Sequence, residues 1–334
     1  MWFAEPGGLD RAVADLQAIS PDIEVVIAPY EEEWNRRSDR GAHPDRDWLA
    51  TQPDLTQEFS QELGRANAIL ALDIPIDLAT LAPNLQLLQA LGAGADQFRP
   101  CLRGDGLVVT SSAGSNAPGI AEFAFGRILE HYKRFAEIRE LQQAHTWQPL
   151  FGREAAGKTL GLIGFGAINS ELAARARAFS LRVVATRNSA KAGDTDPRLD
   201  ALFPADQLSD MLGECHAVVA AVPSSPSTDG MMNAAAFAAM KPGSFFCNVG
   251  RGSLVDEDAL LSAIDSGHLG GAALDVASSE PLADDHPLWD EPKVALSYHN
   301  AAVPEAMFGA SHALFAENVR RHLAGEPLRS LVTF

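Results

Sequence analysis

TLGLIGFGAIN, residues 159–169, is the most informative stretch of the chain. A short apolar strand at 159–163 runs into Gly164 and Gly166, and a helical pattern follows. In such a strand–turn–helix the first glycine permits a tight turn. The second lets the backbone approach a pyrophosphate, which the helix N-terminus attracts. The stretch therefore predicts a dinucleotide site. Its expected members are Gly164, Phe165, Gly166, Ala167 and Ile168.

Asn169 stands where this kind of motif usually has a third glycine. That glycine normally allows the helix to pack closely on the strand, so we expect Asn169 to push the helix slightly outward. An ordinary strand-to-helix turn without a ligand is the alternative interpretation. The position of the turn within a repeated strand–helix pattern favours the dinucleotide.

Short apolar strands and helices continue to alternate on the C-terminal side of this motif. This alternation predicts a parallel sheet that is covered by helices on both faces. We expect strands at 159–163, 182–186, 216–222, 244–249, 270–276 and 293–297. Together they define a doubly wound, Rossmann-like, dinucleotide-binding domain at 113–303.

The N-terminal third predicts a second domain of the same class. We expect strands at 1–4, 23–28, 67–72, 85–91 and 107–110, and helices at 9–19 and 56–66. The charged and aromatic stretch 31–55 is interpreted as a surface excursion. A last helix at 304–324 is expected to return to this half. The predicted fold is therefore α/β, with two Rossmann-like or flavodoxin-like domains built on doubly wound parallel sheets. The first domain is discontinuous, comprising 1–112 plus 304–334.

A long helix is expected between the domains, from 117 to about 143. Asn116 can act as its cap or as a hinge, and Pro118 suits its first turn. Its apolar residues form two stripes, which are Ile120, Ala124, Ile128 and Tyr132, and Phe125, Leu129 and Phe135. Because one core face needs only one stripe, the helix is either deeply buried or part of a subunit interface. The second interpretation predicts a homodimer.

The composition restricts the partners. Of 334 residues, 46% are hydrophobic and 21% charged, which is ordinary for globular domains. The 44 Asp and Glu outnumber the 26 Lys and Arg, and the net charge of −18 repels nucleic acid and anionic membrane surfaces. We therefore expect neither as a partner. A site for small anions would need local arginines or helix N-termini.

Cys101, Cys215 and Cys247 are widely spaced and match no metal-ligand pattern, so no metal is expected. Such cysteines suit a reducing compartment. The N-terminal residues lack the apolar core of a signal peptide, and no apolar run reaches the roughly 18 residues of a transmembrane helix. We expect a cytoplasmic protein.

The residues after the strand at 182–186 predict the cofactor. An Asp or Glu at this point would bind the ribose 2′-hydroxyl of NAD, but the chain has Thr186-Arg187-Asn188-Ser189. The guanidinium of Arg187 can hold a 2′-phosphate, and its polar neighbours can donate hydrogen bonds. We predict NADPH in preference to NADH. A solvated Arg187 beside a permissive NAD site is the alternative.

Several blocks, taken in order between about residues 65 and 310, resemble the D-isomer-specific 2-hydroxyacid dehydrogenase family. The longest, MKPGSFFCNVGRGSLVD at 240–256, is close to the family signature. The others are LGAGAD at 91–96, NAPGIAE at 116–122, ALDV at 273–276 with Glu280-Pro281, and PLW at 287–289 with His299. Ala277-Ser278 and Tyr298 depart from the family, which usually has bulkier residues and a proline at these places.

The resemblance implies reduction of a small 2-oxo acid to the D-2-hydroxy acid, with Arg251, Glu280 and His299 as the catalytic group. Arg251 lies in a glycine-flanked turn, and its planar guanidinium suits a carboxylate and an adjacent carbonyl oxygen. His299 can protonate the nascent alkoxide. Glu280 is expected to hydrogen-bond His299 and to favour its charged form. Alternatively, Arg251 pairs with Asp256 or Asp275, His299 is structural, and Glu280 is an exposed loop residue.

The resemblance also implies the remaining contacts. The backbone amides of Ala93 and Gly94 are expected to hold the substrate carboxylate. Further cofactor contacts are expected from Val222, Pro223, Val249, Gly250 and Asp275. Asp275 has two other interpretations, which are orienting the Arg251 turn and capping a strand.

Other functions stay in competition. Glyoxylate, hydroxypyruvate and bulkier aryl or alkyl pyruvates are all candidate substrates. The main rival is a dinucleotide-sensing binding protein with little turnover, because a fold alone does not imply function. A sensor, however, has no need of Arg251, Glu280 and His299 together. An oxidase of formate or another very small anion has no specific support. A phosphoglycerate-type enzyme with a regulatory tail is disfavoured because little sequence follows 304–324.

Overall fold

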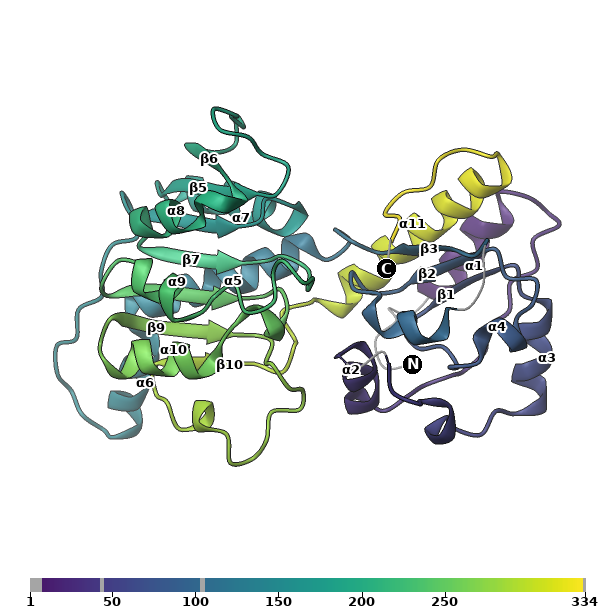
Figure 1. Cartoon of the computed structure of the whole chain (residues 1–334), viewed down its shortest axis with the longest axis horizontal. Helices are drawn as coiled ribbons and strands as arrows, with labels where there is room; N and C mark the ends of the chain where they lie inside the picture. Colours follow the sequence, from purple (N-terminus) through teal and green to yellow (C-terminus); the bar gives the residue numbers. More distant parts are fainter. Residues whose placement is uncertain (1–7, 43–44, 103–105, 333–334) are drawn as a thin grey trace. The chain divides into compact units, whose positions relative to one another are not determined.

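The computed structural model describes residues 8–42, 45–102 and 106–332 (Figure 1). The chain divides into two compact units, one formed by Met1–Asn116 with Val303–Phe334 and the other by Ala117–Ala302. The expected strand at 1–4 lies outside the described residues. No helix formed by the described residues is long and apolar enough to cross a membrane.

A seven-stranded sheet forms the centre of the larger unit. All of its strand pairs are parallel, in the order β10-β9-β8-β7-β4-β5-β6. The strands are β4 (Thr159–Ile163), β5 (Arg182–Arg187), β6 (Ala201–Pro204), β7 (Ala217–Ala220), β8 (Ser244–Asn248), β9 (Leu269–Leu274) and β10 (Val294–Leu296). The six strands predicted for this half are confirmed. β6 was missed, because a short edge strand that ends in Pro204 carries little periodic signal.

Helices cover both faces of this sheet, as Figure 1 shows. One face carries α5 (Ala117–Lys133) and α7 (Ala167–Ala178). The other carries α8 (Leu208–Glu214), α9 (Ala234–Ala239) and α10 (Glu257–Asp265). Side chains of one strand alternate between the two cores, so that Val183 packs on the first face and Val184 on the second. This is why the strands are apolar throughout.

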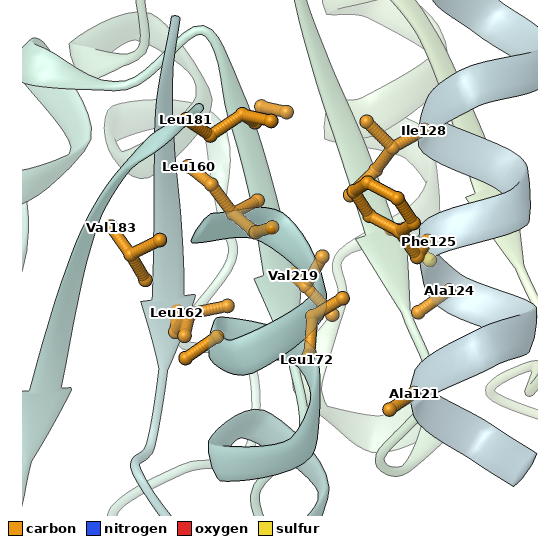
Figure 2. Close-up of a cluster of buried hydrophobic side chains, with 14 of the residues drawn as sticks. Ala121, Ala124, Phe125, Ile128, Leu160, Leu162, Leu172, Leu181, Val183 and Val219 are labelled. Atoms are coloured by element: carbon orange, nitrogen blue, oxygen red, sulfur yellow. The ribbon is translucent and has the colours of Figure 1, made fainter. Parts of the chain in front are cut away.

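The first of these cores is drawn in Figure 2. Leu160 and Leu162 of β4 face Leu172 of α7, and Phe125 and Ile128 of α5 close the same cluster. Leu160, Leu162, Leu172 and Ile128 are fully buried. Burying each such side chain contributes about 1.5–3 kcal/mol, so the sheet and its helices stabilise each other.

The long helix expected at 117–143 is two helices. It breaks at Arg134, which has a left-handed backbone with φ of 58°, and α6 (Phe135–Gln143) follows. Of the residues in the two apolar stripes, only Phe135 lies beyond the break. Ala124, Phe125, Ile128 and Tyr132 are buried in α5, whereas none of the described α6 residues is buried.

The smaller unit holds a three-stranded parallel sheet in the order β1-β2-β3. Its strands are β1 (Ala68–Ala71), β2 (Leu87–Ala90) and β3 (Val108–Ser111), and its helices are α1 (Gly8–Gln17), α2 (Trp34–Ala42), α3 (Gln57–Arg65), α4 (Leu78–Leu81) and α11 (Pro304–Leu323). The C-terminal helix α11 belongs to this unit. Gln89 of β2, fully buried, donates to the Ser311 carbonyl at 3.2 Å and accepts from Asn318 at 2.8 Å.

Short 3-10 turns complete the structure. They are η1 (Leu49–Thr51), η2 (Asp96–Cys101), η3 (Ala205–Gln207), η4 (Gly252–Leu254) and η5 (Pro287–Trp289). All three cysteines are buried and none forms a disulfide.

Two expectations for the smaller unit are wrong. Residues 23–28, which the structure describes, form no strand, and Val26 and Ile27 are each half exposed. The stretch 31–55 is also not confined to the surface. The Arg40 guanidinium lies 2.9 Å from the Glu32 carboxylate, and both side chains are buried. Charged residues are predicted to be exposed because a sequence does not show that two of them neutralise each other in the interior.

His131, near the end of α5, is a partly buried histidine on the first face of the large sheet. Its ring stacks on Phe245 of β8 with centroids 4.7 Å apart, and its Nε2 lies 2.7 Å from Arg153 Nη2. Burial, and next the positive charge of Arg153, lowers the pKa of His131 to about 4. The native ring is therefore neutral near pH 7, and its Nε2 accepts a hydrogen bond from the guanidinium.

We expect the larger unit to lose stability as the pH falls from about 6.5 toward 4, because the unfolded chain protonates His131 and the native chain does not. The free energy of unfolding from denaturant titrations should be lower at about pH 5 than at about pH 7, and His131 should account for roughly 1–2 kcal/mol of that difference. The variant His131→Gln should lose less unfolding free energy between these pH values. The variant His145→Gln, which changes an exposed histidine, should behave like wild type. An equal loss in His131→Gln would contradict this expectation.

Candidate active site

The predicted site residues of the larger unit gather along one edge of its sheet. Because all strands are parallel, their carboxyl ends lie at the same edge, which is where ligands bind in such folds. Arg251 follows β8, Glu280 follows β9, and His299 follows β10, and these three strands are neighbours. The turns after β4, β5 and β7 lie along the same edge.

His299 and Glu280 form a direct pair. His299 Nδ1 lies 3.0 Å from Glu280 Oε2, and their side chains are 35% and 16% exposed. The other carboxylate oxygen, Oε1, accepts from the backbone N–H of Ala277 at 3.2 Å. The carboxylate therefore engages Nδ1 of the ring, and Nε2 is the atom from which His299 can deliver a proton.

Asp275 holds the loop that presents His299. The backbone of His299 is left-handed, with φ of 56°, which is uncommon for a residue of this size. The Asp275 carbonyl accepts the His299 N–H at 2.7 Å. Its buried carboxylate accepts from Ser297 Oγ at 2.7 Å, Asn300 N–H at 3.0 Å and Ala301 N–H at 3.1 Å. Together these hydrogen bonds hold the loop in place and stabilise the left-handed backbone of His299.

The turn that carries Arg251 is held by Asn248, the last residue of β8. The side chain of Asn248 donates to the Arg251 carbonyl at 2.8 Å and accepts from the Gly250 N–H at 3.0 Å. A Cβ on Gly252 would overlap the Ala277 carbonyl oxygen, so glycine is required for this close approach. The Arg251 turn therefore contacts the loop that carries Glu280.

The carboxylates that were alternative partners of Arg251 have bonds of their own. Asp256 caps α10 by accepting the Ala259 N–H at 3.0 Å. Asp275 accepts from the 297–301 loop, as described above. The Arg251 guanidinium donates to the Gly250 carbonyl at 2.8 Å.

The glycine-rich turn after β4 has the shape of a phosphate cradle. Gly164 has φ of 80°, and a Cβ there would overlap Cγ1 of Val222, which follows β7. Thr186 Oγ1 accepts the Gly164 N–H at 3.2 Å and so supports the turn from inside. Gly166 is the N-cap of α7, and no described atom lies within 4 Å of where its Cβ would be. These residues fit a dinucleotide pyrophosphate at the helix N-terminus.

Asn169, in place of the third glycine, is accommodated inside the unit. It is 1% exposed, and its Nδ2 donates to the carbonyls of Ile163 at 3.0 Å and Gly164 at 2.6 Å. The amide thus ties the first turn of α7 to the end of β4. The expected outward push is offset by two hydrogen bonds that a glycine could not make.

Two arginines share one carboxylate beside this turn. Arg198 binds Asp196 with two nitrogens, at 2.8 and 2.7 Å, and lies 4.6 Å above the Phe165 ring. It also donates to Ser170 Oγ at 2.7 Å. Arg187 Nη1 lies 3.6 Å from the same Asp196. The hydrogen bonds from Arg198 hold the pKa of Asp196 at about 2, so the carboxylate stays charged.

The sequence motifs did not predict roles for Asn248, Asp196 and Arg198. Asn248 lies within the family-like block, but its role requires the turn geometry. Asp196 and Arg198 lie in the irregular segment between β5 and β6 and match no motif, so only the folded chain places them beside Phe165.

The remaining predicted contacts are found as follows. Asn188 and Ser189 are exposed after β5, Pro223 is exposed after β7, and Val249 is buried after β8. Ala93 and Gly94 belong to the smaller unit and follow β2 there. Ser112 donates its backbone N–H to the Gly92 carbonyl at 2.9 Å, which supports this turn.

Comparison with known proteins identifies the larger unit. Residues 125–301 match the family model for the NAD-binding domain of D-isomer-specific 2-hydroxyacid dehydrogenases. The chain is 32% identical over 246 residues to glyoxylate/hydroxypyruvate reductase A of Serratia proteamaculans, covering 74% of each protein. It is 34% identical over 251 residues to (S)-sulfolactate dehydrogenase of Chromohalobacter salexigens, covering 74% of this chain and 80% of that protein.

A further relative is longer. D-3-phosphoglycerate dehydrogenase of Mycobacterium leprae is 32% identical over 287 residues, which cover 82% of this chain but 52% of that protein. Among solved structures, the NADPH-dependent glyoxylate/hydroxypyruvate reductase of Sinorhizobium meliloti, in complex with NADP and sulfate, superposes with a TM-score of 0.75 at 26% identity. That match covers 97% of this chain and 95% of the other. By sequence and by structure, the chain belongs to the D-isomer-specific 2-hydroxyacid dehydrogenase family.

Proposed function

We propose that this NAD(P)-dependent dehydrogenase reduces a small 2-oxo acid of the glyoxylate or hydroxypyruvate kind to the D-2-hydroxy acid and prefers NADPH. The observation that carries the proposal is the His299–Glu280 pair, 3.0 Å between ring and carboxylate, beside the Arg251 turn. Two relatives whose names include glyoxylate/hydroxypyruvate reductase support the substrate class.

Each member of this group has a distinct task in the reduction. The bound reduced cofactor supplies a hydride to the oxo carbon. Arg251 binds the substrate carboxylate and the adjacent carbonyl oxygen, which gives a protein of net charge −18 a local cation for its anionic substrate. His299 protonates the developing alkoxide from Nε2. Glu280 keeps the ring oriented and stabilises its charged form, so that a proton is available for each turnover.

We infer further that the smaller unit and the remaining strand ends supply binding contacts. The backbone amides of Ala93 and Gly94 hold the substrate carboxylate, since small residues permit close approach. The turn at Gly164 and Gly166 receives the pyrophosphate. We also place the enzyme in the cytoplasm, a compartment that suits three buried thiols without disulfides.

The substrate is tested by following oxidation of NADPH, and separately of NADH, across a panel of 2-oxo acids that runs from glyoxylate and hydroxypyruvate to aryl pyruvates. We expect turnover on the small members and a D-configured product on chiral chromatography. His299→Ala should lower kcat by roughly 100- to 10,000-fold, the usual contribution of general acid catalysis. His322→Ala, in the smaller unit, serves as the control. Tight NADPH binding without turnover on any acid would instead favour the dinucleotide sensor.

The preference for NADPH rests on the charges after β5. Arg187 and Arg198 share one carboxylate, so the cluster retains a net positive charge of one guanidinium. Arg198 joins this cluster to Phe165 of the glycine-rich turn and to Ser170 in α7. Asp196 is engaged by both arginines, and the polar residues that follow Arg187 are exposed. This arrangement suits a 2′-phosphate better than a 2′-hydroxyl.

Arg187→Ala should lower kcat/KM for NADPH by roughly 10- to 100-fold, because a charge-assisted hydrogen bond contributes about 1.5–3 kcal/mol. The value for NADH should change by no more than about twofold, the effect of an ordinary surface substitution. Arg182→Ala is the matched control, since Arg182 is an exposed arginine at the other end of β5. A wild-type preference for NADH, or an equal loss with both cofactors, would contradict the assignment.

We also propose a homodimer, with the segment that follows α5 as its interface. Phe135 and Ile138 of α6 are 53% and 42% exposed, and Trp147 and Phe151 in the following segment are 103% and 83% exposed. Monomers rarely leave several large apolar side chains exposed within one short stretch of chain. A second copy of this segment, related by a twofold axis, would cover them.

Light scattering should give twice the monomer mass for the wild-type chain. The double variant Trp147→Asp, Phe151→Asp should give the monomer mass, because each carboxylate would have to be buried in the interface. Val26→Asp, which places the same charge on an exposed apolar residue of the smaller unit, should remain dimeric. A monomeric wild type would rule out this interface.

A further inference from the structure

We propose that Glu257 positions the His299–Glu280 pair for proton transfer by anchoring the loop that carries Glu280. Glu257 is the first residue of α10 and lies outside the predicted catalytic group. Its carboxylate accepts the backbone N–H of Ser278 at 2.7 Å and the Ser278 hydroxyl, also at 2.7 Å. The inference rests on the proposed function, because it assigns Glu257 a role in the same proton transfer.

The anchor is a buried one. Glu257 is 8% exposed, although a glutamate at the start of a helix can normally reach water. Hydrogen bonds to an ionised carboxylate are short and strong. A carboxylate that is withdrawn from water is costly to leave without hydrogen-bond donors. The carboxylate therefore fixes both the backbone and the side chain of Ser278.

Ser278 directly follows Ala277, the residue whose backbone N–H contacts the Glu280 carboxylate. The preceding residue, Ala277, donates its N–H to Glu280 Oε1 at 3.2 Å, and Glu280 Oε2 contacts His299 Nδ1. The carbonyl of Ala277 lies against Gly252, beside Arg251. If Ser278 shifted, Ala277 would shift with it, and both the Glu280 orientation and the Arg251 turn would change. A continuous series of contacts thus leads from α10 to the proton donor.

Charged and titratable groups on the neighbouring elements complete the surroundings of Glu257. His286 lies before η5, with its Nε2 3.5 Å from Glu257 Oε2. Its Nδ1 accepts the Leu288 N–H at 3.3 Å, which leaves the proton on Nε2, facing the carboxylate. Asp256 caps α10, and Asp258 is exposed on the same turn. The hydroxyl of Ser278 gives the Glu257 carboxylate a second hydrogen bond beside that from the backbone.

Glu257→Ala tests the proposal, with Asp258→Ala as the matched control, because Asp258 is an exposed acid in the same first turn. We expect Glu257→Ala to lower kcat for 2-oxo acid reduction by up to roughly 100-fold, the cost of a small misplacement of catalytic groups. KM for NADPH should change by about twofold or less. The pH at which reductase activity is half lost should fall, because a displaced Glu280 stabilises the charged ring less. Glu257→Asp should restore part of the rate, and Ser278→Ala, which keeps the backbone bond, should lose less than Glu257→Ala.

A second readout does not require turnover. The His299 ring signal in histidine-labelled protein can be titrated by NMR, with His299→Ala to assign it. We expect the midpoint of this titration to move down in Glu257→Ala and to stay unchanged in Asp258→Ala. An unchanged midpoint in a folded Glu257→Ala variant that still binds NADPH overturns the proposal, because it would reduce Glu257 to a structural residue. If the midpoint moves but wild type turns over no 2-oxo acid, the anchor stands and the proposed function fails.

Discussion

The rest of the structure depends on one constraint, which is that all seven strands of the large sheet are parallel and both faces of the sheet are buried. A parallel strand cannot reach its neighbour by a tight hairpin, so each connection must cross the sheet, usually through a helix. These helices bury both faces and leave the carboxyl edge to turns. Arg251, Glu280 and His299 are far apart in sequence but leave β8, β9 and β10 side by side.

Carboxylates that accept hydrogen bonds fix several of the loops at this edge. The Asp275 carboxylate accepts from three donor groups of the loop around His299, Glu257 accepts two hydrogen bonds from Ser278, and Asp196 binds two nitrogens of the Arg198 guanidinium. Each turn would be costly to distort, because a buried carboxylate without its donors is unfavourable. An acidic protein thus uses part of its negative charge to fix loops.

Two asparagine side chains and one close glycine contact hold the turns at this edge. Asn248 closes the Arg251 turn on both sides, and Gly252 lets that turn touch Ala277. Asn169 replaces a packing glycine yet ties α7 to the end of β4 through two carbonyls. In both places an amide side chain substitutes for missing backbone partners at a strand end, where the sheet ladder stops and polar groups would otherwise be left without hydrogen bonds.

The sequence by itself determined the fold class, the positions of six strands of the larger unit, and the glycine-rich and family-like motifs, because apolar periodicity and short motifs are local properties of the chain. It did not reveal β6, the break at Arg134 or the absence of a strand at 23–28, since these depend on packing that overrides local preference. The sequence also did not reveal the contact of Arg198 with Phe165 or that of Glu257 with Ser278. Each pair joins segments separated by a crossover, and only the tertiary structure decides which side chains meet when those segments are laid along the same edge.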